Sequence, residues 1–333
     1  MGSQPKTVAS FFSGIGGLDL GFERSNFKVT MQCEIDDFCN QILARHWPHT
    51  KRFGDIGGLD HEEIPESDVY VGGFPCQDVS LARMGPRAGL RGRQSGLFYK
   101  FASLIEKGLP RVVLLENVPG LLSSHQGRDF GIVIGTLAEL GYGVGWRVLN
   151  SRYFGVPQSR QRVYVVGCRG DWRGPAEILF EPERGNGHLE KGKSNGTAAV
   201  SPFKTVLGDP VAGPVFQGIA YCLYAESARH TGTDWSRTYI TYPDGRVRRL
   251  MPNECEGLQG FPVGWTMPEK PPEDANELDT MRYHAIGNAV TVNVAEWLAR
   301  RTSRYLDAGA FDDAHRGLAA NAASEVQVPV ASR

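Results

Sequence analysis

Several hallmarks of common protein classes are missing from this 333-residue chain. Its six cysteines form no Cys-x-x-Cys pair and are too few for a disulfide scaffold of this length, which favours a reducing compartment. No apolar run approaches the roughly 18 residues that a membrane-spanning helix needs. Glycines and Asp19 also interrupt the only apolar patch near the start, where a signal peptide would need an unbroken one. We therefore expect a cytoplasmic protein with no membrane partner.

The chain also lacks an excess of positive charge, because its formal net charge is -1. A hydrophobic fraction of 41% and a charged fraction of 22% are ordinary for a globular protein with a sizeable core. The charge is patterned locally, however. Residues 79–105 contain five basic residues and no acid, whereas residues 254–279 contain seven acids against one lysine. A polyanion could meet the first segment and avoid the second.

Short apolar runs of strand character alternate with helical patterns along the first half of the chain. We predict helices at 97–107 and 130–140, and strands at residues 6–12, 28–34, 69–72, 112–115, 144–149 and 163–167. This alternation predicts an α/β fold with a doubly wound, mostly parallel sheet.

A glycine turn at residues 13–17 follows the first predicted strand. Glycines there let the backbone approach a ligand closely. The dinucleotide fingerprint needs a third glycine where this chain has Asp19, so a nucleotide-dependent oxidoreductase is disfavoured. Glu34 follows about 20 residues later and could accept hydrogen bonds from ribose hydroxyls. The alternative is a solvated carboxylate that caps the next helix, where Asp36 and Asp37 resemble helix-start residues.

Cys76 follows the strand at 69–72, and Glu116 follows the strand at 112–115. Ligands of α/β sheets bind at the carboxyl ends of the strands, so a thiol and a carboxyl at neighbouring strand ends are candidates for covalent catalysis. A lone cysteine in such a turn is more often a small buried hydrophobe. The sequence around it, Pro-Cys-Gln after paired glycines, together with Glu-Asn-Val at 116–118, favours the catalytic interpretation.

These segments resemble the motifs of the C5-cytosine-specific DNA methyltransferase family, of bacterial or phage type, and the resemblance extends from about Val8 to Arg301. It implies the fold of S-adenosylmethionine-dependent methyltransferases, with a Cys76 thiolate that adds to C6 of a flipped cytosine. Glu116 is then the acid at N3, and Arg162, in Gln-x-Arg-x-Arg, contacts the cytosine O2 and supports Glu116.

The resemblance also implies further site residues, and it implies no metal. Those expected at the S-adenosylmethionine site are Phe12, Gly14, Gly16, Gly17, Leu18, Glu34, Ile35, Asp55, Ile56, Gly73, Pro75, Leu97, Asn288, Ala289 and Val290. Those expected to contact DNA are Gln77, Ser80, Arg83, Arg87, Arg91, Arg93, Arg160, Arg229 and Arg237. The glycine- and arginine-rich run at 81–94 corresponds to a lid that closes over DNA.

The composition changes after Asp171, and the chain beyond it favours a separate unit with strands at 220–225 and a hairpin at 238–250. By resemblance this is a target-recognition domain. The expected division is a catalytic and cofactor-binding domain at 1–171, a recognition domain rich in β structure at 172–247, a return to the catalytic domain at 248–305 with a closing helix at 290–301, and a disordered tail at 306–333. Candidates for base contacts are Arg229, His230, Thr231, Thr233, Arg237 and Arg246.

Two alternatives share much of this pattern. An RNA C5-cytosine methyltransferase acting on tRNA would use the same chemistry, although that branch has Cys-Phe-Thr where this chain has Cys-Leu-Tyr at 222–224. A non-catalytic DNA-binding relative would typically lack the cysteine or the cofactor motifs, and this chain keeps both. The expected partner is double-stranded DNA, the sequence leaves open whether a companion restriction endonuclease acts on the same site, and the expected state is a monomer.

Overall fold

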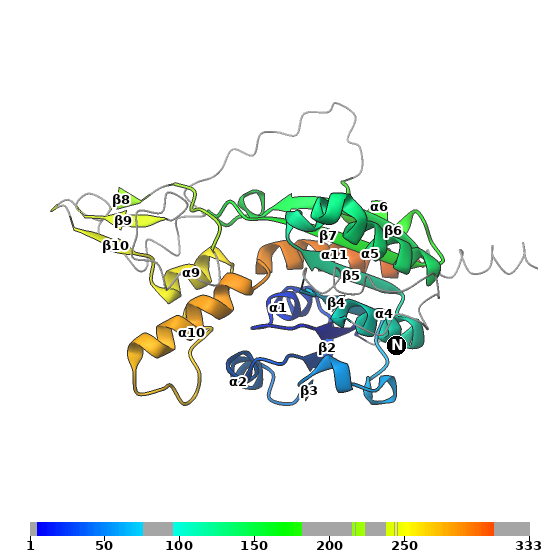
Figure 1. Ribbon diagram of the computed structural model, residues 1–333, viewed down its shortest axis with the longest axis horizontal. Helices are drawn as coiled ribbons and strands as arrows, with labels where there is room; N and C mark the ends of the chain where they lie inside the picture. The colour runs from blue at the N-terminus through cyan, green and yellow to red at the C-terminus, as the bar shows by residue number, and fades with distance from the viewer. Residues whose placement is uncertain are drawn as a thin grey trace, which may run out of the picture.

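A seven-stranded sheet forms the centre of the protein in the computed structural model, which describes residues 5–75, 96–181, 215–216, 218–223, 238–242, 244 and 246–309 (Figure 1). The strand order is β3-β2-β1-β4-β5-β7-β6. The strands are β1 (Thr7–Phe11), β2 (Lys28–Cys33), β3 (Lys51–Phe53), β4 (Val69–Gly72), β5 (Val112–Asn117), β6 (Tyr142–Asn150) and β7 (Gln161–Arg169). Strands β1 to β5 are parallel, and β7 runs antiparallel to both neighbours. The predicted doubly wound, mostly parallel sheet is confirmed.

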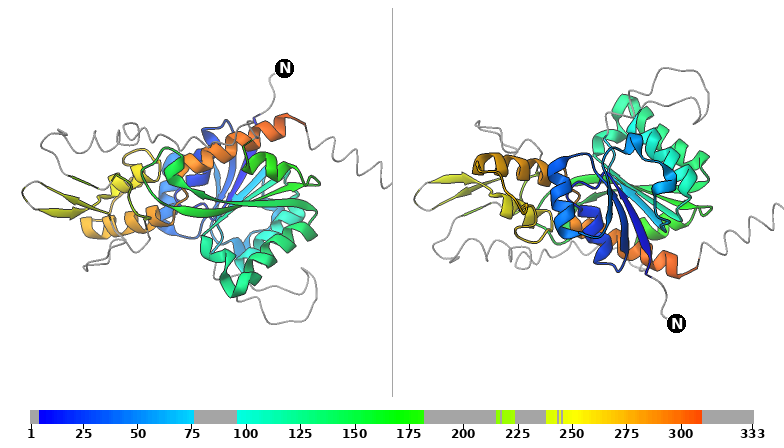
Figure 2. Two further views of the ribbon diagram at one scale, coloured as in Figure 1. Left: turned by 90° about the horizontal axis from the view of Figure 1, so that it is seen from above. Right: turned by 90° about the horizontal axis from the view of Figure 1, so that it is seen from below.

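Helices cover both faces of this sheet (Figure 2). On one face, α4 (Leu97–Gly108) and α5 (Arg128–Glu139) bury apolar side chains against β1, β4 and β5. On the other face lie α1 (Gly17–Glu23), α6 (Gly174–Leu179) and α11 (Val292–Asp307). Strands β1, β4 and β5 are therefore buried on both sides, which explains why they appear in the sequence as continuous apolar runs.

A third apolar cluster joins α2 (Asp37–His46) to the later part of the chain, with α9 (Pro252–Leu258) and α10 (Ala275–Asn288). A small antiparallel sheet, ordered β10-β9-β8, lies beside it and consists of β8 (Val215–Phe216), β9 (Tyr239–Thr241) and β10 (Val247–Arg249). The hairpin expected at 238–250 is confirmed. The strand expected at 220–225 is wrong within its described residues, because only Ala220 forms an isolated bridge, to Gln158.

The expected start of the recognition domain at residue 172 falls before α6. That helix packs against β6, β7 and α11 and buries Ile178 and Leu179 in the core of the large sheet. The closing helix is α11, which begins two residues later than expected and extends to Asp307. The tail beyond residue 309 lies outside the described residues. None of the helices in the described part of the chain is both long and apolar enough to cross a membrane.

Candidate active site

Glu34 follows β2 at the carboxyl edge of the sheet, where its carboxylate is held by two backbone groups. The N–H of Gly14 donates to Glu34 Oε2 at 2.7 Å, and the N–H of Asp36 donates to Oε1 at 2.9 Å. The glycine turn and the start of α2 therefore fix this carboxylate from two sides. The predicted cap of α2 is also present, because Asp36 Oδ1 accepts from the N–H of Cys39 at 2.8 Å.

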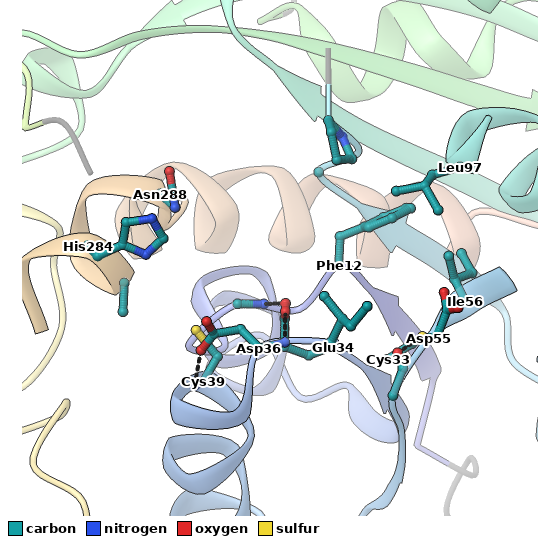
Figure 3. A pocket seen from close by; sticks show the side chains of 16 residues that line it. Phe12, Cys33, Glu34, Asp36, Cys39, Asp55, Ile56, Leu97, His284 and Asn288 are labelled. Carbon is teal, nitrogen blue, oxygen red and sulfur yellow. Dashed lines mark hydrogen bonds between the residues drawn. The ribbon is translucent and has the colours of Figure 1, made fainter. Parts of the chain in front are cut away.

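A pocket of about 260 Å³ opens beside this carboxylate at the carboxyl ends of β1, β2 and β4 (Figure 3). The residues expected at the cofactor site that line it are Phe12, Gly14, Glu34, Ile35, Asp55, Ile56, Gly73, Pro75, Leu97 and Asn288. Gly54 and Ala285 also line it and belong to segments, 54–56 and 285–290, that resemble family motifs at the cofactor site. The lining residues that the sequence reasoning missed are Cys33, Asp36, Cys39 and His284. Asp36 follows the expected Ile35, and Cys39 lies in the first turn of α2, so both are close in sequence to expected residues. His284 comes directly before the segment 285–290.

Five residues expected at the cofactor site do not line the pocket: Gly16, Gly17, Leu18, Ala289 and Val290. A Cβ on Gly17 would lie 2.5 Å from the carbonyl oxygen of Val290, so this glycine lets α1 approach the segment before α11 closely. Leu18 is 4% exposed and belongs to the core beneath the sheet. Gly17 and Leu18 therefore contribute packing that positions the glycine turn.

The pocket around the Glu34 carboxylate has both apolar and acidic walls. Phe12, Leu97 and Ile56 supply apolar surface, and Ile35 is 72% exposed. Phe12 also has a φ of 53°, an uncommon value for a residue other than glycine. Asp55 adds a second carboxylate, which accepts from the N–H of Gly57 at 2.8 Å. Apolar walls beside a carboxylate that can accept from hydroxyls suit a nucleoside.

Glu116 lies at the carboxyl end of β5, next to the end of β4. Its carboxylate is 3.0 Å from Arg162 Nε on β7, and both side chains are largely buried. Burial raises the pKa of Glu116 above its ordinary value, while the positive charges of Arg162 and Arg160 act in the opposite direction. The pair predicted between Glu116 and Arg162 is therefore present in the structure.

The segment that leaves β4 is held close to Glu116. Asn117 Nδ2 donates to the carbonyl oxygen of Phe74 at 2.8 Å, and a Cβ on Gly73 would lie 3.0 Å from Glu116 Oε2. Pro75, the last described residue of this segment, lines the pocket. The pocket beside Glu34 and the carboxyl of Glu116 are therefore adjacent, as expected for the ends of neighbouring strands.

Arg160 does not lie where the sequence reasoning expected it. Its side chain is buried, and the residue is 2% exposed. Its guanidinium donates to the carbonyl oxygens of Leu223, Gly287 and Ala289 at 2.8 to 3.0 Å. The expected DNA contact is therefore corrected: Arg160 ties the start of β7 to the segments beside the pocket.

Several of the expected site residues belong to segments that the structure does not describe. The candidate nucleophile Cys76 and the expected DNA contacts Gln77, Ser80, Arg83, Arg87, Arg91, Arg93, Arg229 and Arg237 lie outside the described residues. The same holds for His230, Thr231 and Thr233. Arg246, the remaining candidate for base contacts, is exposed and forms an ion pair with Asp244 at 2.7 Å.

Comparison with known proteins gives one consistent result. The model of a family described as C-5 cytosine-specific DNA methylase matches residues 6–196 and 216–304. The type II methyltransferase M.SsoII of Shigella sonnei is 31% identical over 320 residues, which cover 90% of this chain and 80% of that protein. M2.BsuMI of Bacillus subtilis strain 168, also named a type II methyltransferase, is 31% identical over 307 residues, which cover 89% and 75%.

Solved structures share the fold. A DNMT2 mutant from Spodoptera frugiperda superposes with a TM-score of 0.63 at 17% identity, covering 89% of this chain and 99% of that one. A methyltransferase of Entamoeba histolytica, EhMeth, superposes with a TM-score of 0.62 at 19% identity, covering 93% and 99%.

Proposed function

The chain belongs to the C-5 cytosine-specific DNA methylase family, and from this premise we propose that it methylates C5 of a cytosine within a short duplex DNA sequence. The observation that carries the proposal is the buried pair of Glu116 and Arg162 beside the end of β4. The carboxyl lies one strand away from the segment that leads to Cys76. Neighbouring strand ends would therefore present a nucleophile and an acid to the same pyrimidine ring.

Cytosine is a poor electrophile, and C5 becomes reactive only after a nucleophile adds to C6. In the proposed mechanism the Cys76 thiolate forms a bond to C6, and the resulting negative charge spreads into the ring. After C5 has been methylated, water or a base removes the C5 proton, the bond between C6 and Cys76 breaks, and the thiolate leaves.

Glu116 relieves the ring charge by sharing a proton with N3. Its burial raises its pKa, which increases the fraction of protonated carboxyl available at neutral pH. Arg162 holds the carboxyl in place through the 3.0 Å contact and limits that rise. The opposing effects of burial and of Arg162 suit a group that must both hold and release a proton.

The pocket residues fit S-adenosylmethionine, which supplies the methyl group when it is bound. Glu34 would accept from the ribose hydroxyls, since its carboxylate is already fixed by Gly14 and Asp36 and retains lone pairs toward the pocket. Ile35 and Ile56 would contact the adenine, and Asp55 would accept from its amino group.

Because a nucleophile must approach C6 perpendicular to the ring, and stacked neighbours cover both ring faces within the duplex, we infer that the target base flips out of the helix. The basic residues of the segment 81–94 would close over the phosphate backbone, which makes affinity depend on salt. The type II names of the relatives support a companion restriction endonuclease that cuts the same sequence. We expect the enzyme to act as a monomer in the bacterial cytoplasm.

The proposal is tested by base-resolution bisulfite sequencing of DNA from a methylation-free bacterial host that expresses the chain. Wild type should give 5-methylcytosine confined to one short motif, and Cys76→Ala should give none. Glu116→Gln, which keeps the shape of the side chain but loses the titrating proton, should reduce the methylated fraction by about a hundredfold or more.

Wild-type turnover by Cys76→Ala would refute the covalent mechanism. If the soluble wild-type protein binds S-adenosylmethionine but leaves DNA unmethylated, RNA becomes the substrate to test, by competition between tRNA and duplex DNA.

A further inference from the structure

His284 lies on α10, one helical turn before Asn288, and both side chains line the pocket. Residues four apart share a face of a helix, so the two side chains project in the same direction. Figure 3 shows them across the pocket from Asp36 and Cys39 at the start of α2. His284 is exposed, and its imidazole has no hydrogen-bond partner among the described residues.

The two ends of the pocket differ in polarity. Phe12, Leu97 and Ile56 cluster at one end with the Asp55 carboxylate beside them, and the side chains of His284, Asn288 and Asp36 lie toward the other, as Figure 3 shows. S-adenosylmethionine has the same asymmetry, with a flat base at one end and a charged amino-acid group at the other. The apolar end suits the base, which leaves the amino-acid group for the end where His284 lies.

The charge of the pocket lining makes His284 distinctive. Among the described lining residues there are three carboxylates, of Glu34, Asp36 and Asp55, and neither lysine nor arginine. Those carboxylates attract the α-ammonium group of an amino acid but repel its α-carboxylate. Within that lining, the His284 imidazole is the one side chain that can carry positive charge, and the Asn288 amide is its only companion with an N–H donor.

We propose that His284 donates a hydrogen bond to the α-carboxylate of S-adenosylmethionine and offsets the acidic lining of the pocket. The inference rests on the proposed function, because it assumes that this cofactor occupies the pocket. It assigns to α10, which follows the small sheet in the chain, a direct part in holding the charged end of the cofactor.

The experiment is isothermal titration calorimetry with two matched ligands, S-adenosylmethionine and its decarboxylated form, which keeps the sulfonium and the amine but lacks the carboxylate. His284→Ala should weaken binding of S-adenosylmethionine by about tenfold, the usual effect of losing a hydrogen bond to a charged group. It should leave binding of the decarboxylated ligand within about twofold, because the partner group is absent.

His284→Gln, which keeps an N–H donor but not the charge, should fall between wild type and His284→Ala. His49→Ala is the matched control, since His49 is exposed and lies outside the pocket lining. Equal losses for both ligands, or no loss for S-adenosylmethionine, would overturn the assignment of His284 alone. If wild type binds neither ligand, the proposed function falls with it.

Discussion

A buried carboxyl beneath the glycine turn makes the stability of this fold depend on pH. Asp19 on α1 is 0% exposed. Its oxygens accept from Ser10 Oγ on β1 and from Gln32 Nε2 on β2, both at 2.9 Å. Burial raises the pKa of Asp19 from 3.8 to about 6, because the loss of hydration outweighs these two hydrogen bonds. The same two strands lead into the pocket at Phe12 and Glu34.

The sign and size of the effect follow from that pKa. A carboxyl whose pKa is higher in the folded than in the unfolded state contributes most stability below pH 3.8, and this contribution is lost as the pH rises through about 6. The rise in pKa corresponds to a total loss of about 3 kcal/mol. Roughly half of that loss falls between pH 5 and pH 8.

Asp19→Asn removes the titration while keeping the shape of the side chain, so its stability relative to wild type should increase by about 1 kcal/mol between pH 5 and pH 8. Urea unfolding at several pH values measures this difference, and any constant cost of the altered hydrogen bonds cancels between the two pH values. Asp37→Asn, at the exposed start of α2, is the control. A relative stability of Asp19→Asn that stays flat over this range would refute the reasoning.

Two further substitutions test the packing around the site. Gly73→Ala places a methyl group about 3.0 Å from Glu116 Oε2 and should lower DNA methylation at least several-fold without unfolding the protein. Gly135→Ala, whose new methyl group has nothing within 4 Å, should change neither activity nor stability. Equal activities of the two variants in DNA methylation assays would contradict this. Arg160→Ala removes one donor from each of three carbonyl oxygens and should cost about 3 kcal/mol in denaturant unfolding. The exposed Arg152→Ala should cost little. Comparable losses for the two variants would show that Arg160 does not tie these segments together.

The sheet was predictable because its central strands are apolar on both faces and alternate with amphipathic helices. The same reasoning missed α10, whose buried residues include Arg282. That arginine is paired with Glu256 at 3.0 Å, and a charged residue in a core position hides the apolar stripe of a helix. The sequence shows that Arg282 is charged, but whether such a side chain is buried depends on partners, such as Glu256, that are distant in the chain.

The candidate site shows the same limit. Glu34 and Glu116 each follow an apolar strand, so their place at the carboxyl edge of the sheet could be predicted from local patterns. Arg160 was assigned to DNA from the family resemblance, but its partners are carbonyl groups of residues 223, 287 and 289. His284 was missed because it lies just before the segment 285–290 that resembles a family motif, and it joins the pocket through the packing of α10.

The pocket is closed by parts of the chain that are synthesised at very different times. Its walls at Phe12, Glu34 and Leu97 leave the ribosome early, while α10 follows only after the small β sheet. Contacts of such large sequence separation form late in folding because a long loop must close first. A nascent chain therefore carries Cys76 and Glu116 long before it can hold a cofactor firmly. DNA methylation by a newly made chain should therefore begin only after α10 has packed against the rest of the pocket.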